Sequence, residues 1–187
     1  MDQHQPTSWM KNNECFLLQK LWQACCPYYY DLFTNVYVAA TTLSFDWLGC
    51  QELNSVAERH GYVVGTSAEK GTSLLTVGSI VLPTYKSTIR PTDYENGQLG
   101  EYAIPGGEEK VMMHAQIQHP GDINRCRHIV GTTLVLAQSS EGSVTLTDFE
   151  RGEVATLGRQ TKEGYGIGIS RVDQKSCCTC AVDGRLY

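Results

Sequence analysis

Cysteine and histidine are the residue types of this sequence that could bind a metal or act as nucleophiles. The 187 residues include eight cysteines and five histidines. Cys177, Cys178 and Cys180 form a Cys-Cys-x-Cys cluster, whereas zinc sites prefer Cys-x₂₋₄-Cys pairs on loops with a second pair elsewhere. This cluster falls within a predicted strand and no second pair is spaced to meet it. We therefore interpret these cysteines as small buried residues of a sheet and expect no metal and no cofactor.

Catalysis by a Cys/His pair is the other chemistry to consider. Cys126 and His128 would point to the same face of one strand, but a nucleophile needs an activated, exposed thiolate, for which nothing in the sequence argues. The sequence has no Gly-rich phosphate loop, no G-x-S-x-G elbow and no H-E-x-x-H motif. We therefore expect a protein that binds and is not an enzyme. A Cys-rich metal or redox protein is the alternative from another class, which stoichiometric zinc would favour.

Composition narrows the class of protein. The formal net charge is −5, with 41% hydrophobic and 19% charged residues, which excludes a disordered polyelectrolyte. An acidic chain without a Lys/Arg cluster is a poor direct binder of nucleic-acid phosphates. Apolar runs such as Ile80-Val81-Leu82-Pro83 are far shorter than the about 20 residues of a membrane span. With no secretory signal at the start, we expect reduced thiols in a cytosolic or nuclear setting and no membrane partner.

The first section has the pattern of a helix. From Asn13 to Cys26 the apolar residues recur on one helical face, at Leu17, Leu18, Leu21, Trp22 and Cys25. Pro27 is expected to end the helix, because proline cannot donate the next backbone bond. The apolar face is expected to pack on the rest of the protein, with a partner's groove as the alternative. The N-terminal region is thus residues 1–27.

The remainder, residues 28–187, has the period of two that is typical of strands, as in Leu43, Phe45 and Trp47 alternating with Thr42, Ser44 and Asp46. Runs of this kind lie at 42–48, 62–66, 74–82, 110–118, 123–129, 133–138, 144–149, 153–157, 165–170, 176–181 and 185–187. Turn chemistry separates them at Glu69-Lys70-Gly71, Glu141-Gly142 and Asp183-Gly184, of which the last two predict tight hairpins. Residues 84–109 predict a long surface loop. The body is therefore expected to be all-β.

An internal repeat indicates which all-β architecture this is. The hairpins at Glu141-Gly142 and Asp183-Gly184 are 42 residues apart, and a period of about 40–45 with several strands is typical of a WD40-type β-propeller. The expected blades are about 42–118, about 119–158 and the start of a third at about 159–187. Because a propeller needs roughly four to eight blades, we expect an incomplete ring of about two and a half blades. It would be a fragment or would need another chain.

Several motifs carry a family resemblance. Pro27-Tyr28-Tyr29-Tyr30-Asp31-Leu32 looks like the exit of an N-terminal helix in the histone-binding WD-repeat proteins, the retinoblastoma-binding and chromatin-assembly-factor small-subunit group. His119 to Arg127 is similar to that family's His-x-Gly-Glu-Val-Asn-Arg-x-Arg segment. Lys162-Glu163-Gly164-Tyr165-Gly166 is identical to its Lys-Glu-Gly-Tyr-Gly. The resemblance runs from about Leu17 to Tyr187.

The sequence also departs from the family pattern. Ala39-Ala40-Thr41-Thr42-Leu43 stands in place of Glu-Trp-Pro-Ser-Leu. Arg159-Gln160 replaces the expected Gly-His, so Asp183 is expected to lack its usual hydrogen-bond partner. The family's acidic loop near its C-terminus, which helps to hold a histone H4 helix, has no counterpart in the sequence. We therefore expect this chain alone to bind histone H4 weakly.

The resemblance implies two binding surfaces and a nuclear location. A basic histone H3 tail would bind at the top of the propeller, at positions that match the family motif: Asp122, Asn124, Arg125, Glu163 and Tyr165. A histone H4 helix would bind in a groove beside the N-terminal helix at Tyr28, Tyr29 and Leu32. Implied partners are subunits of chromatin assembly, remodelling or deacetylase complexes. The glutamate-rich WD-repeat group of ribosome assembly is the nearby alternative, since Leu43-Ser44-Phe45-Asp46 fits it well.

Overall fold

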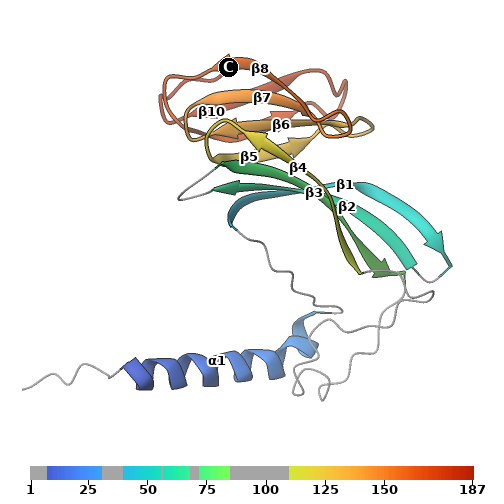
Figure 1. The fold of residues 1–187 in the computed structure, drawn as a ribbon, viewed down its shortest axis with the longest axis vertical. Coiled ribbons are helices and arrows are strands. Elements are labelled where there is room, and N and C mark those ends of the chain that lie inside the picture. The colour runs from blue at the N-terminus through green and yellow to red at the C-terminus, as the bar shows by residue number, and fades with distance from the viewer. Residues whose placement is uncertain (1–7, 31–39, 56, 68–71, 85–109) are drawn as a thin grey trace, which may run out of the picture.

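The computed structural model describes residues 8–30, 40–55, 57–67, 72–84 and 110–187. Its elements begin with one helix, α1 (Ser8–Tyr29), which lies apart from the sheets (Figure 1). The strands of the first sheet are β1 (Thr41–Asn54), β2 (Ala57–Ser67), β3 (Ser73–Pro83) and β4 (Val111–His119). The second sheet holds β5 (Ile123–His128), β6 (Leu134–Ser139), β7 (Ser143–Asp148) and β8 (Glu153–Arg159). The last pair is β9 (Gly164–Ile169) and β10 (Cys177–Ala181).

Helix α1 extends beyond its predicted bounds at both ends. The prediction that it stops at Pro27 is wrong, since the backbone N–H of Tyr30 donates to Cys26 O at 3.0 Å and closes one more turn. A proline removes only its own N–H from the helical series, so the following donors can still bond. The prediction that the apolar face packs on the rest of the chain is also wrong, because Leu17, Leu18 and Leu21 are 63–65% exposed.

Each sheet is an antiparallel meander whose strand order follows the chain: β1-β2-β3-β4, β5-β6-β7-β8 and the pair β9-β10. The all-β prediction is therefore confirmed. Strand β1 is longer than expected, because its pairing with β2 continues through Gly49↔Gly61 to Asn54↔Ala57. That extension has mostly exposed polar residues, so it carries no apolar alternation to predict it.

The predicted hairpin turns are confirmed. Gly142 has φ +80° and Gly184 has φ +76°, in the left-handed region that such turns require. The N–H of Gly142 donates to Ser139 O at 3.0 Å, and that of Gly184 to Ala181 O at 3.1 Å. The predicted turn at 69–71, and residues 85–109 of the predicted loop, lie outside the described residues.

The core lies between the first two sheets. Val63, Leu75 and Val77 of the first sheet pack in one cluster with residues of the second, among them Ile123 and Val135. The two sheets also meet through β1 and β5, where the N–H of Cys126 donates to Ser44 Oγ at 2.8 Å. Burial of this apolar cluster fixes how the second sheet sits on the first.

The first strands of the three sheets lie alongside one another and run in the same direction. Ser44 contacts Cys126, and two residues further along both strands Asp46 contacts His128. The start of β5 bonds the start of β9 through Asn124 and Gly164, and these two strands also meet near their ends. Residues that begin these strands therefore share one end of the molecule, and residues that end them share the other.

Strand β1 turns its polar side toward β5. Ser44 is buried there, whereas Leu43, Phe45 and Trp47 on the other side are about half exposed. Phe45 contacts Trp47 edge-on, with ring centroids 4.9 Å apart. The apolar alternation thus predicted the strand, but this apolar side is not the one that lies in the core.

Candidate functional site

The starts of β5 and β9 are held together by a buried amide. Asn124 is 7% exposed, and its Nδ2 donates to the backbone carbonyl of Gly164 at 3.2 Å. A buried side-chain amide that is bonded in this way fixes the spacing of the two strands. Asp122 and Glu163, which precede the two strands, are consequently brought to the same end, which we call the strand-start end.

Asp122 is the more rigid of these two carboxylates. Ser73 Oγ donates to Asp122 Oδ1 at 2.6 Å, and the N–H of Asp122 donates to Ser140 Oγ at 3.2 Å. The N–H of Ser140 in turn donates to Asp122 O at 2.8 Å. These bonds from two different sheets hold a half-buried carboxylate in a defined position.

Glu163 and Tyr165 form an exposed pair at the same end. The Tyr165 hydroxyl donates to Glu163 Oε2 at 2.9 Å. The pKa of Tyr165 is raised above 10.0, first because the phenol donates this bond to Glu163, then because of desolvation and the negative charge. A carboxylate beside an aromatic face is a suitable environment for a Lys or Arg side chain.

Arg125 and Glu141 differ from the sequence prediction in opposite ways. Arg125 is half-buried on β5, and none of the hydrogen bonds or ion pairs of the described residues joins it to the other four predicted site residues. Glu141 was not predicted, yet its Cγ lies 3.0 Å from where a Cβ on Gly121 would stand. It also pairs with Arg159, with Oε2 and Nη2 3.7 Å apart. The hairpin repeat could have identified it, because that turn faces the strand-start end.

Buried polar pairs support this end in successive sheets. His119 Nε2 lies 2.7 Å from Thr145 Oγ1, and Gln160 Nε2 donates to Thr179 Oγ1 at 2.9 Å. Gln160 also accepts a hydrogen bond from Gln138. Burial lowers the pKa of His119 below 6.5, which favours the neutral ring. Gln160 thus supplies a hydrogen bond like that of His119 without a titrating group.

The prediction that Asp183 lacks a partner is wrong. Its carboxylate accepts from Thr161 Oγ1 at 2.9 Å, from the Arg185 N–H at 3.0 Å and from the Tyr187 hydroxyl at 2.9 Å. These bonds lower the pKa of Asp183 to about 2, with the Arg185 N–H as the largest cause. Thr161, which follows Gln160, therefore takes over the role that the missing histidine was expected to play.

The predicted helix surface is only partly described. Tyr28 and Tyr29 are 79% and 78% exposed and lie within the last turn of α1. Leu32 lies outside the described residues. The two tyrosines continue the exposed apolar surface formed by Leu17, Leu18 and Leu21.

The cysteine cluster is not buried as predicted. Cys177 and Cys180 are exposed and Cys178 is half-buried, because β10 pairs with β9 and makes only an isolated bridge to Leu186 on its other side. Within the described parts of the chain, no group of three His, Cys, Asp or Glu residues could hold a metal ion. No helix of these parts is long and apolar enough to span a membrane.

A comparison with known families identifies the N-terminal part of the sequence. The model of a family described as the histone-binding protein RBBP4, or a component of the CAF1 complex, matches residues 18–84. Residues 18–84 belong to this family. The match confirms the resemblance that the sequence motifs indicated, and it spans most of α1 together with β1, β2 and β3. Tyr28, Tyr29 and Leu32 lie inside the matched segment of the RBBP4/CAF1 family, whereas Asp122 and Glu163 lie outside it.

Proposed function

We propose that this chain is a histone-binding scaffold of the WD-repeat class, which acts without catalysis in nuclear chromatin assembly, remodelling or deacetylase complexes. The observation that carries the proposal is the match of residues 18–84 to a family described as histone-binding. The strand-start end supports it independently, because its carboxylates and tyrosine suit a basic peptide.

The proposed architecture is a WD40-type β-propeller whose successive blades are the three sheets. The arrangement of β1, β5 and β9 supports it, since the inner strands of a propeller run in the same direction around a common axis while each blade is an antiparallel meander. An experimental structure in which the sheets pack as a closed sandwich without radial symmetry would contradict it.

The proposed tail site comprises Asp122, Asn124, Arg125, Glu163 and Tyr165. Asp122 and Glu163 would pair with Lys or Arg side chains of histone H3 through charge-assisted hydrogen bonds. Asn124 holds the two strand starts at their spacing, and Tyr165 offers an aromatic face to a cation. Arg125 would help to place the peptide backbone.

The proposed second surface is the apolar side of α1 with Tyr28, Tyr29 and Leu32. Side chains that are 63–65% exposed at Leu17, Leu18 and Leu21 form a stripe that an amphipathic partner helix could cover. We assign this surface to histone H4, because it lies on the segment that matches the histone-binding family.

The test of the tail site is titration of the full chain with an unmodified peptide of the H3 N-terminal tail. Asp122→Asn combined with Glu163→Gln removes two negative charges and keeps the shape of both side chains. We expect this double variant to weaken binding at least about tenfold, since hydrogen bonds to charged groups contribute about 1.5–3 kcal/mol each.

The matched control is Glu150→Gln combined with Glu153→Gln. Both glutamates are exposed, and they lie in the turn after β7 and at the start of β8, away from the strand-start end. The control removes the same charge, and its affinity should stay within about twofold of wild type. Absence of binding, or equal affinity of the first double variant and wild type, would defeat the assignment. Preferential capture of ribosomal proteins over histones would do the same.

A further inference from the structure

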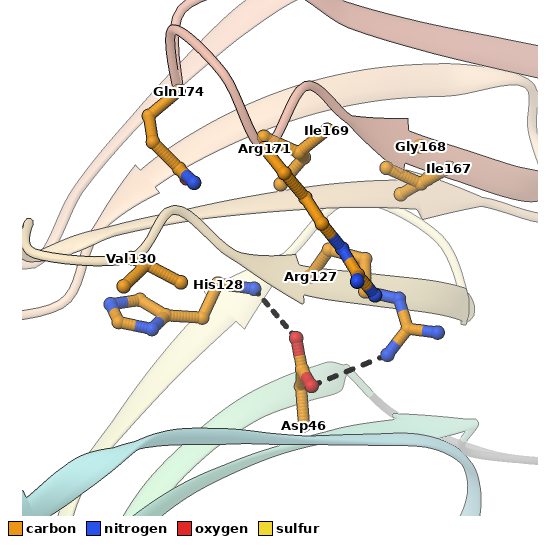
Figure 2. Close-up of a pocket in the computed structure, with 9 residues that line it drawn as sticks. All are labelled: Asp46, Arg127, His128, Val130, Ile167, Gly168, Ile169, Arg171 and Gln174. Carbon is orange, nitrogen blue, oxygen red and sulfur yellow. Dashed lines mark hydrogen bonds and ion pairs between the residues drawn. The ribbon is translucent and has the colours of Figure 1, made fainter.

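A cavity of about 400 Å³ opens at the end of the inner strands that is opposite to the strand-start end (Figure 2). Asp46 of β1, Arg127 and His128 of β5, and Arg171 of the turn after β9 line it. Three separate sheets therefore contribute to one cavity. No hydrogen bond of the strand-start end reaches it, since β5 separates the two regions along its length.

The one carboxylate in the wall is already engaged. Asp46 Oδ1 lies 3.2 Å from Arg127 Nη1, and Asp46 Oδ2 accepts the backbone N–H of His128 at 2.9 Å. The His128 ring is bonded to the carbonyl of Thr132 at 2.8 Å. Asp46 thus neutralises Arg127 and joins β1 to β5, with both of its oxygens occupied.

Arg171 adds a second guanidinium without a second carboxylate. In Figure 2 its side chain extends from the turn after β9 into the cavity, toward the side where Arg127 and Asp46 lie. None of the ion pairs among the described residues includes Arg171. The cavity wall consequently carries two fixed positive charges against one negative charge.

The remaining wall is mixed in polarity. Val130, Ile167 and Ile169 supply apolar surface, and the amide of Gln174 points into the cavity (Figure 2). A volume of about 400 Å³ exceeds what a bare ion fills and suits a side chain with several carbon atoms. Asp46 in the wall repels a dianion more strongly than a monoanion, which favours a carboxylate over a phosphate group.

We propose that this cavity, formed by Asp46, Arg127, Arg171 and Gln174, binds the carboxylate side chain of an acidic peptide. Arg171 would hold the carboxylate bidentately, Gln174 would donate from its amide, and the methylenes of a glutamate would contact Ile167 and Ile169. The site is distinct from the proposed histone-tail site and selects ligands of the opposite charge.

The test is fluorescence anisotropy of the full chain with a labelled, N-acetylated and C-amidated tetraglutamate peptide, with tetraglutamine as the neutral probe. Arg171→Gln should weaken tetraglutamate binding at least about tenfold, because a charge-assisted pair is lost. Arg171→Lys should give an intermediate loss, since lysine keeps the charge but not the planar fork. Arg171 is exposed, so both variants should fold.

The matched control is Arg185→Gln, which removes the same charge from an exposed side chain in the β10 hairpin. Its affinity for tetraglutamate should stay within about twofold of wild type. Equal binding by wild type and Arg171→Gln, equal binding of tetraglutamine, or no binding at all would overturn the proposal. Displacement by inorganic phosphate at the same concentration as by free glutamate peptide would overturn the choice of a carboxylate. None of these outcomes depends on histone binding.

Discussion

The two ends of the inner strands carry opposite charge on the same scaffold. At the strand-start end, Asp122 and Glu163 precede β5 and β9, whereas Arg127 and Arg171 lie toward or beyond the other ends of these strands. Because the strands run in the same direction, a sequence position near a strand start or a strand end decides which charged surface a residue joins. Strand direction, more than net charge, thus determines what each surface can bind.

The separation of the two ends makes them electrically independent. Five steps of about 3.3 Å along β5 place Ile123 and His128 about 16 Å apart. The screening length is about 8 Å at physiological ionic strength, so charges at one end barely affect ligands at the other. We therefore expect each end to respond only to substitutions of its own residues.

Glycines at the two ends of β9 provide the comparison with the largest expected effect. A Cβ at Gly164 would overlap the side-chain amide of Gln138, whereas a Cβ at Gly168 would have nothing within 4 Å. Gly164→Ala should lower the free energy of unfolding by about 1–3 kcal/mol, because Gln138 must move away from its buried partners. Gly168→Ala should change it by less than about 0.5 kcal/mol. Urea unfolding measures both, and equal stability of the two variants would contradict the packing at the strand-start end.

The buried polar pairs give the second comparison, through pH. The pKa of His119 is lowered by burial below 6.5, so as pH falls the unfolded chain takes up a proton that the folded state resists. The stabilisation is fully present above that value and is lost as pH falls toward the lowered pKa of the folded state. His119→Gln copies the hydrogen bond of Gln160 to Thr179 and removes this titration.

Thermal unfolding at about pH 7.5 and about pH 5.5 measures this effect. The wild-type midpoint should drop more than that of His119→Gln over this range. If both proteins lose the same amount, the buried neutral His119 does not contribute to the pH dependence of stability.

The smallest expected effect separates the ring of Tyr165 from its hydroxyl. Tyr165→Phe keeps the aromatic face, so affinity for the H3 tail peptide should stay within about twofold of wild type. Tyr165→Ala removes the face and should weaken binding about two- to fivefold, as expected for an exposed cation–π contact. Titration calorimetry distinguishes these values, and an effect of the Phe variant as large as that of Ala would assign the role to the hydroxyl bond with Glu163.

Local patterns predicted the strands and the hairpins because each depends on nearby residues. Gly142 and Gly184 predicted their turns from the φ that those turns need. The family motifs indicated Asp122 and Glu163, but Glu141 was missed because its proximity to Gly121 arises only after β6 returns toward the start of β5.

Other predictions failed because they depend on which surfaces meet. The apolar stripe on α1 indicated a helix but not a partner for it, and Leu17 and Leu18 are exposed. The partners of Asp183 include Thr161, 22 residues away, which no local motif identifies. The cavity with Arg171 requires three sheets, so its charge could not be predicted from the spacing of its residues.

Hydrogen exchange of the full chain, with and without a saturating unmodified H3 tail peptide, tests the central claim most directly. The account predicts slower exchange in segments 120–125 and 161–166 at the strand-start end, and unchanged exchange in segments 127–130 and 167–174 around the cavity. Protection confined to the cavity segments, or no protection in either region, would contradict it.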